Sequence, residues 1–276
     1  MIKEIFIKHI YPYLSPRLKE KVLFIWKKIR MSHRHIFAEF LFFISSIFKI
    51  NIYNLNLFEQ NFYCQNGEDG ILRVIFNRIK PTNYFAVEFG ISPKEGNSVY
   101  LKKKGWKCLW MDANGDGEVV KREWSTAENI NELFIKYNVP YEFDLLSIDV
   151  DFNDYWIWKA IDSKYRPRVV VIEYNSSIPP TESKVVKYDS NGRWDGETNY
   201  FGASLLALTK LAKEKKYILV CCDSKGVNAF FIREDLIKNN FLIRDIKEIY
   251  RSPRYGEKIR GKYVGYKQSK IPMIDV

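Results

Sequence analysis

The sequence predicts an α/β fold in which helices flank a mostly parallel sheet that has an antiparallel hairpin at one edge. Beyond residue 57, short apolar runs alternate with helical stretches, which is typical of a parallel sheet covered by helices. Several runs end in an acid or an amide, at the strand ends where open α/β sheets bind ligands. Only residues 223–227 separate the last two runs, so these should form an antiparallel hairpin.

The chain has 276 residues, enough for one large core with appendages. We expect a basic, partly apolar helical appendage over 1–56, the main domain over 57–245 and a basic extension over 246–276. The last part reads as a solvated tail, although its interspersed tyrosines could also stack nucleic-acid bases.

The amino-terminal segment 1–35 holds nine Lys or Arg and two Glu, and its apolar residues recur at helical spacing after Pro16. It predicts a helix that packs on the main domain or contacts a membrane surface peripherally. The next segment, 36–50, is apolar nearly all round but shorter than the roughly 20 residues of a membrane span. It would be sandwiched against the core or lie in a homodimer interface.

The composition favours anionic partners, because 44 Lys and Arg exceed 33 Asp and Glu, a net charge of +11. Phosphates, nucleotide-linked sugars, nucleic acid and acidic lipids all fit this charge. No nucleic-acid-binding motif is present, however, so nucleic acid is not expected as a partner. A nucleic-acid- or membrane-surface-binding module on a non-catalytic scaffold stays as the alternative function. The four cysteines show no CxxC spacing, which predicts a reduced, cytoplasmic protein without a zinc site.

The main domain contains seven expected strands, and the first of them runs into a glycine turn. In order, the strands are 84–89, 107–112, 118–124, 143–149, 168–174, 217–222 and 228–232. Glu88 and Gly90 stand at the end of the first strand, and Asn97 opens the next helix, whose free N–H groups can meet a ligand. The turn is not GxGxxG and no P-loop follows, which disfavours dinucleotide binding.

The second strand ends at Asp112, where one carboxylate can accept hydrogen bonds from both hydroxyls of a ribose. The structural alternative is a turn-forming Asp before Asn114 and Gly115.

The densest group of polar residues follows two neighbouring strands. Asp149 ends the run 143–149 and Asp151 follows it, while Glu173 lies near the end of 168–174 and Asn175 follows that run. Asp149 lies in an apolar stretch, where a carboxylate needs a ligand, a cation or donors to offset its desolvation. The four could hold a magnesium-type ion, or one carboxylate could act as a general base without metal.

Ordered blocks from about 61 to 233 resemble the FkbM-type family of S-adenosylmethionine-dependent methyltransferases. These blocks are QNGEDG (65–70), VEFG (87–90), GWKCLWMD (105–112), LLSIDVD (145–151), VVIEYN (170–175), YFGAS (200–204) and GVNAFF (226–231). The resemblance implies a Rossmann-like class I methyltransferase sheet and O-methylation, in the cytoplasm, of a sugar, a nucleotide-sugar or another glycan-biosynthesis intermediate. Fold alone does not fix the acceptor.

The resemblance also implies roles for single residues. Glu88 and Gly90 would border the methionine part of S-adenosylmethionine, with Asn97 beside them, and Asp112 would hold the ribose. Gln65 and Asp69 would close over the site, Ser125 and Thr126 would contact adenine, and Asp149 would lie near the transferable methyl, where Asp149, Asp151 and Glu173 are the candidate catalytic groups.

One segment differs from the family pattern. The family usually has a helix after the strand that ends at Asp112, whereas here only 113–117 precede the next apolar run. A parallel crossover needs a longer link, so either 118–124 is not a parallel strand or residues are absent.

The glycine-punctuated segment 188–201 predicts a substrate-facing lid, with an ordinary crossover loop as its alternative.

Overall fold

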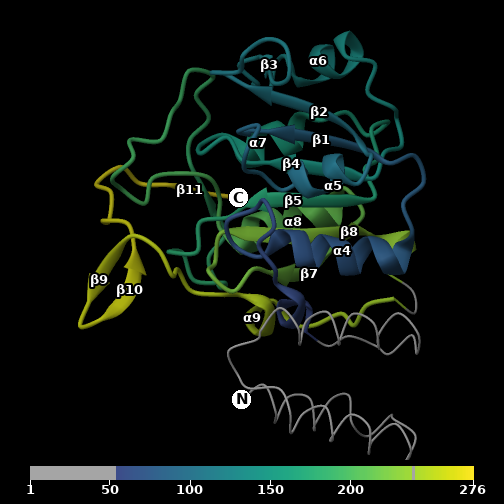
Figure 1. Ribbon diagram of the computed structural model, residues 1–276. Coiled ribbons are helices and arrows are strands. Elements are labelled where there is room, and N and C mark those ends of the chain that lie inside the picture. The colour runs from purple at the N-terminus through teal and green to yellow at the C-terminus, as the bar shows by residue number, and fades with distance from the viewer. Residues whose placement is uncertain (1–53, 238–239) are drawn as a thin grey trace, which may run out of the picture.

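The computed structural model describes residues 54–237 and 240–276 and shows one seven-stranded sheet (Figure 1). The helices expected within 1–35 and 36–50 lie outside the described residues. The strand order is β3-β2-β1-β4-β5-β8-β7. The strands are β1 (Phe85–Phe89), β2 (Lys107–Asp112), β3 (Lys121–Arg122), β4 (Leu145–Ile148), β5 (Val169–Glu173), β7 (Tyr217–Cys222) and β8 (Asn228–Arg233).

Strands β3, β2, β1, β4 and β5 are parallel, whereas β8 is antiparallel to both β5 and β7. The expected edge hairpin is therefore confirmed, and so is the mixed α/β fold. This strand order with an antiparallel β7/β8 edge is that of the Rossmann-like class I methyltransferase sheet.

Helices cover both faces of the sheet. The first face carries α4 (Glu68–Ile79) and the short η2 (Leu55–Phe58) and α5 (Val99–Lys103), and the second carries α6 (Ile130–Lys136), α7 (Asp154–Ala160) and α8 (Leu205–Glu214). Because side chains alternate along a strand, Val87 and Phe89 pack toward the second face while Ala86 packs toward the first. No described helix has the length and apolar character required to cross a membrane.

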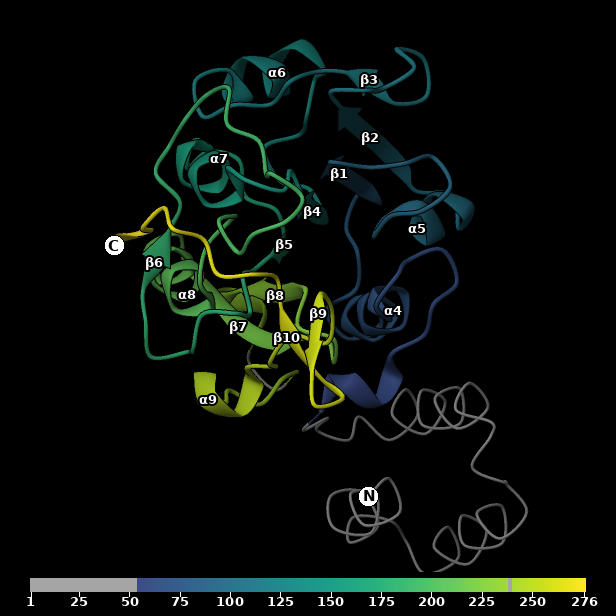
Figure 2. The same cartoon turned by 90° about the vertical axis from the view of Figure 1, so that its left-hand side faces the viewer.

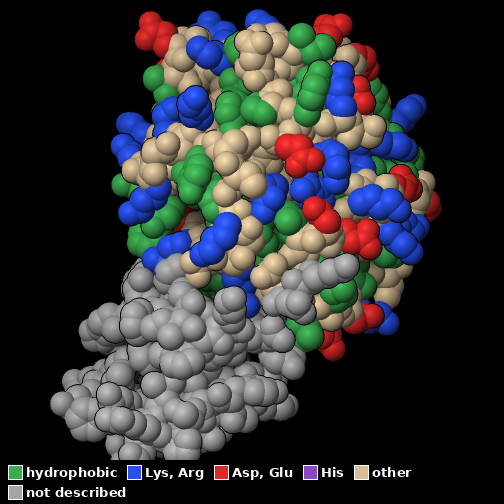
Figure 3. All heavy atoms as spheres, turned by 90° about the vertical axis from the view of Figure 1, so that its right-hand side faces the viewer, with side chains coloured by type: hydrophobic (Ala, Val, Ile, Leu, Met, Phe, Trp, Pro, Cys, Tyr) green, Lys and Arg blue, Asp and Glu red, His purple; other side chains and the backbone are tan. Residues whose placement is uncertain are grey.

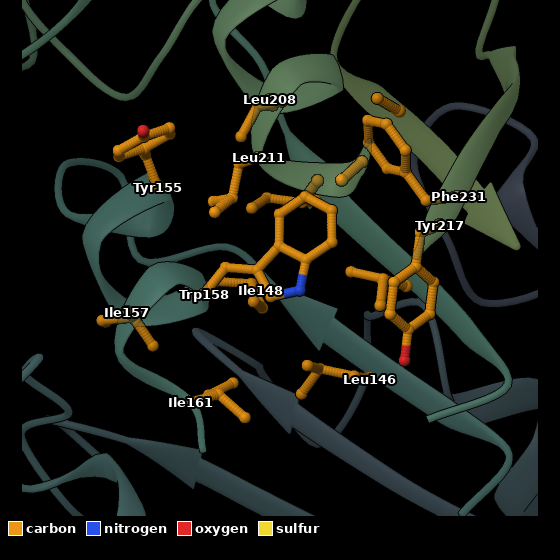
Figure 4. Packing of buried hydrophobic residues seen from close by; sticks show 14 of the residues in the cluster. Leu146, Ile148, Tyr155, Ile157, Trp158, Ile161, Leu208, Leu211, Tyr217 and Phe231 are labelled. Carbon is orange, nitrogen blue, oxygen red and sulfur yellow. The ribbon is translucent and has the colours of Figure 1, made fainter. Parts of the chain in front are cut away.

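The core on the second face is centred on Trp158 of α7. Figure 4 shows its ring between α8 and the sheet, near Leu208, Leu211 and Phe231. Trp158 is 2% exposed, and its ring centroid lies 5.2 Å from that of Phe231. This packing fixes α7, and with it the loop between β4 and α7 that carries Asp149 and Asp151.

The carboxyl ends of the parallel strands point toward the viewer in Figure 2, where two long segments cross in front of them. One is the segment between β6 (Lys184–Val185) and α8. The other is the carboxyl-terminal segment, with β9 (Glu257–Ile259), β10 (Lys262–Gly265) and β11 (Ile274–Asp275), of which β11 pairs with β6. These small strands were not predicted. The remaining short elements are η3 (Glu234–Leu236) and α9 (Ile246–Ile249).

The expected strand 118–124 shrinks to β3, which pairs in parallel with β2 through Met111 and Asp112. The link 113–120 contains no helix, so the expectation that such a short link excludes parallel pairing was wrong. Because β3 has only two residues, which pair with the last two residues of β2, the chain does not have to run back along the whole length of β2 before β3 begins. The loop closes around Asp116, whose Oδ1 accepts hydrogen bonds from the N–H groups of Glu118 and Val120, both at 2.9 Å.

Gly90, directly after β1, packs against the backbone of Asp149, directly after β4. Its φ is +71°, and a Cβ there would lie 1.4 Å from the carbonyl oxygen of Asp149. Any side chain would force the two strand ends apart, because neither backbone can yield.

We therefore expect Gly90→Ala to lower the melting temperature, followed by circular dichroism, by about 10 °C or to prevent folding. Gly117→Ala is the matched control, since Gly117 has a similar φ of +85° but nothing within 4 Å of the added Cβ. The control should lose only about 2–4 °C, the cost of left-handed backbone. Equal losses in the two variants would contradict this explanation.

Candidate functional site

A cavity of about 360 Å³ opens at the carboxyl ends of β1, β2, β3 and β4. Five of the predicted site residues line it: Gly90, Asp112, Ser125, Asp149 and Asp151. The other lining residues are Phe89, Met111, Ala113, Asn114, Glu123, Trp124, Val150, Asn153, Gly192, Arg193 and Trp194. The sheet thus brings residues from distant parts of the sequence around one volume, as expected at such an edge.

Asp112 is half-buried at the end of β2. Its Oδ1 accepts a hydrogen bond from the N–H of Asn114 at 2.7 Å, which is the turn expected as the structural alternative. Its backbone carbonyl accepts from Gly115 and Glu123. One carboxylate oxygen therefore shapes the turn, and no described residue donates to Oδ2 in the cavity wall. The two interpretations of Asp112 are compatible.

Three carboxylates gather beyond β4 and β5. Oxygen atoms of Asp149, Asp151 and Glu173 all lie within 4.8 Å of one another. Within residues 54–237 and 240–276, none of the three forms an ion pair, and Oε2 of Glu173 is buried without a hydrogen bond. We call these three residues the acid cluster.

The acid cluster holds protons more tightly than free carboxyls do. Burial raises the pKa of Asp149 well above its ordinary value, and the negative charges of Asp154 and Asp151 raise it further. The pKa of Glu173 is raised by burial and then by Asp149. Asp151, which is exposed, follows in the same direction through desolvation and the charge of Asp112. Such groups can take up a proton near neutral pH or bind a cation.

Asn175 belongs to the predicted metal set, but its side chain is engaged elsewhere. Its Nδ2 donates to the carbonyls of Asn199 and Phe201, and its Oδ1 accepts from the N–H of Ser177. The side chain therefore fixes the loop before α8, and its oxygen is already used. A metal at this edge would rest on the acid cluster alone.

Glu88 and Asn97 lie behind the cavity wall. Glu88 is 3% exposed and accepts hydrogen bonds from the N–H groups of Asn97 and Ser98, at 2.6 and 2.9 Å, and from the Ser98 hydroxyl. Asn97 donates through Nδ2 to Ser147 at 3.0 Å. Burial raises the pKa of Glu88 to about 7 despite these donors. Both side chains hold the glycine turn after β1 and do not line the cavity.

Gln65 and Asp69 also lie outside the cavity lining. Asp69 is buried, and its Oδ2 accepts from the backbone N–H groups of Phe62, Tyr63 and Cys64. The side chain thus shapes the loop before α4. Gln65 is exposed, and its carbonyl accepts from Asn61 and Lys225.

Of the two residues expected to contact adenine, Ser125 lines the cavity and Thr126 does not. Thr126 is buried and is paired with Asn129, the residue just before α6: its hydroxyl accepts from the N–H of Asn129, and its own N–H donates to Asn129 Oδ1. Ser125 lines the cavity together with Trp124, which the sequence did not single out. Trp124 stacks with the Arg193 guanidinium, 4.5 Å above its ring centroid. The sequence signal that could have identified Trp124 as a site residue is an aromatic side chain at the end of an expected strand.

The segment predicted as a lid, 188–201, does cover the cavity. Gly192, Arg193 and Trp194 line it. Two anchors hold the segment down, because Trp124 donates through Nε1 to the carbonyl of Ser190 and Asn153 donates to that of Asp189, both at 2.7 Å. Only its closed position is described, so lid movement stays a prediction.

The cavity carries the opposite charge to the whole chain. Its lining includes the acids Asp112, Glu123, Asp149 and Asp151 and one base, Arg193. Among the described residues, Glu123 alone of these acids has a lysine partner, Lys136. Figure 3 shows another face, on which Lys and Arg are spread with Asp and Glu between them. The overall charge of +11 therefore does not describe this site.

No protein-family model matches the chain, and no curated protein matches it by sequence. The functional assignment therefore depends on the fold and on the chemistry of the cavity.

Asp154 allows a test of the electrostatics at this edge. It is fully buried, its Oδ1 accepts from Val150 N–H at 2.9 Å, and its Oδ2 has no partner. Burial raises its pKa from 3.8 to about 7. A raised carboxyl pKa means that its contribution to stability is present below about pH 4 and is lost as the pH rises through about 7.

We expect Asp154→Asn, which cannot ionise, to be more stable than the wild type at pH 8 by about 1–3 kcal/mol, with the difference shrinking toward pH 5. Urea unfolding at both pH values measures it. The exposed Asp162→Asn is the control and should show no such trend. A difference that is constant with pH would contradict the raised pKa.

Proposed function

We propose that this chain is an S-adenosylmethionine-dependent O-methyltransferase whose acceptor is a sugar or a glycan-biosynthesis intermediate. The observation that carries the proposal is the position of the cavity. In a class I methyltransferase sheet the cofactor occupies the crevice beyond the first parallel strands, and the cavity here lies beyond β1, β2, β3 and β4 with Gly90, Asp112 and Asp149 in its wall.

The lining suits the parts of this cofactor. Oδ2 of Asp112 is oriented by its turn to accept hydrogen bonds from a ribose diol. Trp124, Ser125 and Met111 offer aromatic, polar and apolar surface where the adenine would lie. Glu88 would act through the shape of the glycine turn, because its own oxygens are used by Asn97 and Ser98.

The acid cluster fits the charge of the reaction. The sulfonium of S-adenosylmethionine is a cation, so unpaired carboxylates next to it are favourable. The same carboxylates repel phosphate, which argues against nucleic acid as the ligand of this cavity.

Methyl transfer is an in-line displacement, so the protein must align the acceptor oxygen, the methyl carbon and the sulfur and exclude water. In our proposal Asp149 lies closest to the methyl and accepts the hydroxyl proton, while Asp151 and Glu173 bind the acceptor. Burial, with the charges of Asp154 and Asp151, keeps the pKa of Asp149 high enough for this role. The three carboxylates would alternatively suit Mg²⁺, which would orient the acceptor oxygen; chelation distinguishes the two cases.

The cofactor prediction concerns Asp112. S-adenosylmethionine at about 100 times its Kd should stabilise the protein by about 2.7 kcal/mol in a thermal shift experiment. In Asp112→Ala the Kd, measured by calorimetry, should rise at least about tenfold through the loss of charge-assisted hydrogen bonds. Asp162→Ala, on an exposed loop, should bind like the wild type. Absence of any shift with millimolar cofactor would overturn the proposal.

The catalytic prediction concerns Asp149. Asp149→Asn keeps the shape of the side chain but cannot accept the proton, so turnover should fall at least about 100-fold, while the Kd of S-adenosylhomocysteine, whose sulfur is uncharged, changes little. Transfer of labelled methyl groups to sugars and nucleotide-sugars provides the assay. Full activity after exhaustive chelation would remove Mg²⁺ from the mechanism, whereas full activity of Asp149→Asn would remove the base.

A further inference from the structure

Four aromatic side chains meet beside the acid cluster, and we call them the aromatic wall: Trp194, Phe201, Tyr255 and Tyr266. The ring of Tyr266 lies 4.6 Å from that of Trp194 and 5.2 Å from that of Tyr255, centroid to centroid. Trp194 and Phe201 are 5.4 Å apart. Phe201 is buried, whereas the other three are half-buried.

Half of the aromatic wall comes from the carboxyl-terminal segment, which the sequence presented as a solvated tail. Residues 256–264 are exposed, as expected of a solvated tail, but the residues on either side of them are held by hydrogen bonds. The N–H of Asn199 donates to the carbonyl of Lys267, and the N–H of Ser269 donates to Asn199 Oδ1, both at 2.8 Å. The Tyr255 hydroxyl lies 3.0 Å from that of Ser176, just beyond β5. The segment is thus attached to the loops that border the site.

The aromatic wall continues from the cofactor cavity to the acid cluster. Trp194 lines the cavity together with Asp149 and Asp151. On the other side, the pKa of Tyr266 is raised by burial and then by the negative charges of Glu173 and Asp151, so these groups lie within electrostatic reach. Trp194 therefore connects the aromatic wall to the cavity that Asp149 and Asp151 line, and Tyr266, in contact with Trp194, lies near the acid cluster.

We propose that the aromatic wall is the acceptor subsite and that it binds an uncharged sugar ring, with Tyr266 as a specificity-determining residue. This inference rests on the proposed methyltransferase function. The C–H face of a pyranose would pack on the rings of Trp194 and Tyr266, and its hydroxyls would donate to Asp151 and Glu173.

The chemistry of the acid cluster selects this class of ligand. The sulfonium of S-adenosylmethionine beside the cluster favours its ionised form. Ionised carboxylates only accept hydrogen bonds, so the ligand must present donors, which hydroxyls do and phosphates do not. An anionic ring would be repelled by three carboxylates. An amine would bind as ammonium, whose pKa the carboxylates raise, and it would have no lone pair for methyl transfer.

Saturation-transfer NMR with the full chain tests the proposal. The probes are neutral methyl glycosides of glucose, galactose, mannose, fucose and rhamnose, added in the presence of S-adenosylhomocysteine. At least one should contact the wild-type protein. Tyr266→Ala should weaken its binding about tenfold, since ring packing contributes about 1 kcal/mol or more, and should leave the Kd for S-adenosylhomocysteine within about twofold.

Tyr263→Ala is the matched control, because Tyr263 lies in the same segment but is 43% exposed on β10 and is not part of the wall. It should bind glycosides like the wild type. If Tyr266→Ala does not fold, Tyr266→Leu keeps an apolar side chain without a ring and replaces it.

Three results would overturn the inference while S-adenosylhomocysteine still binds. They are no contact with any neutral glycoside, equal effects of Tyr266→Ala and Tyr263→Ala, and tighter binding of methyl glucuronide or choline than of the neutral sugars. Failure of S-adenosylhomocysteine to bind would instead count against the proposed function.

Discussion

Desolvated negative charge at the ends of β4 and β5 is the constraint on which the site depends. Asp149, Asp151 and Glu173 are held within 4.8 Å without an ion pair among the described residues, and the backbone fixes them there, because Gly90 packs against the carbonyl of Asp149. Such a group is costly unless it binds protons, a cation or hydrogen-bond donors. In the proposed reaction the sulfonium of the methyl donor is the cation, and the acceptor hydroxyl supplies the hydrogen-bond donor and the proton.

The sheet and its strand ends were predictable because they follow from local patterns. Apolar runs with acids at their ends located β1, β2, β4 and β5, and thus Asp112 and Asp149. What each side chain does was less predictable, since that depends on partners far along the chain. Asn175 donates to carbonyls in the loop before α8, and Thr126 pairs with Asn129 in the turn before α6, although both follow strands as a ligand-binding residue would.

The carboxyl-terminal segment shows the same limit more clearly. Its basic composition and alternating tyrosines resemble a solvated tail, because composition does not reveal hydrogen bonds to residues 70 positions away. Once those bonds are known, the net positive charge of the chain no longer indicates what the site binds. The donor would occupy the cavity beyond β1 to β4, and the acceptor would lie between the acid cluster and the aromatic wall.

A crystal structure of the protein with S-adenosylhomocysteine tests the central claim most directly. The account predicts the ribose hydroxyls on Asp112, the adenine beside Trp124 and Ser125, and the sulfur facing Asp149, with the aromatic wall open beyond it. Nucleoside density at another edge of the sheet, or a ribose that does not contact Asp112, would contradict it.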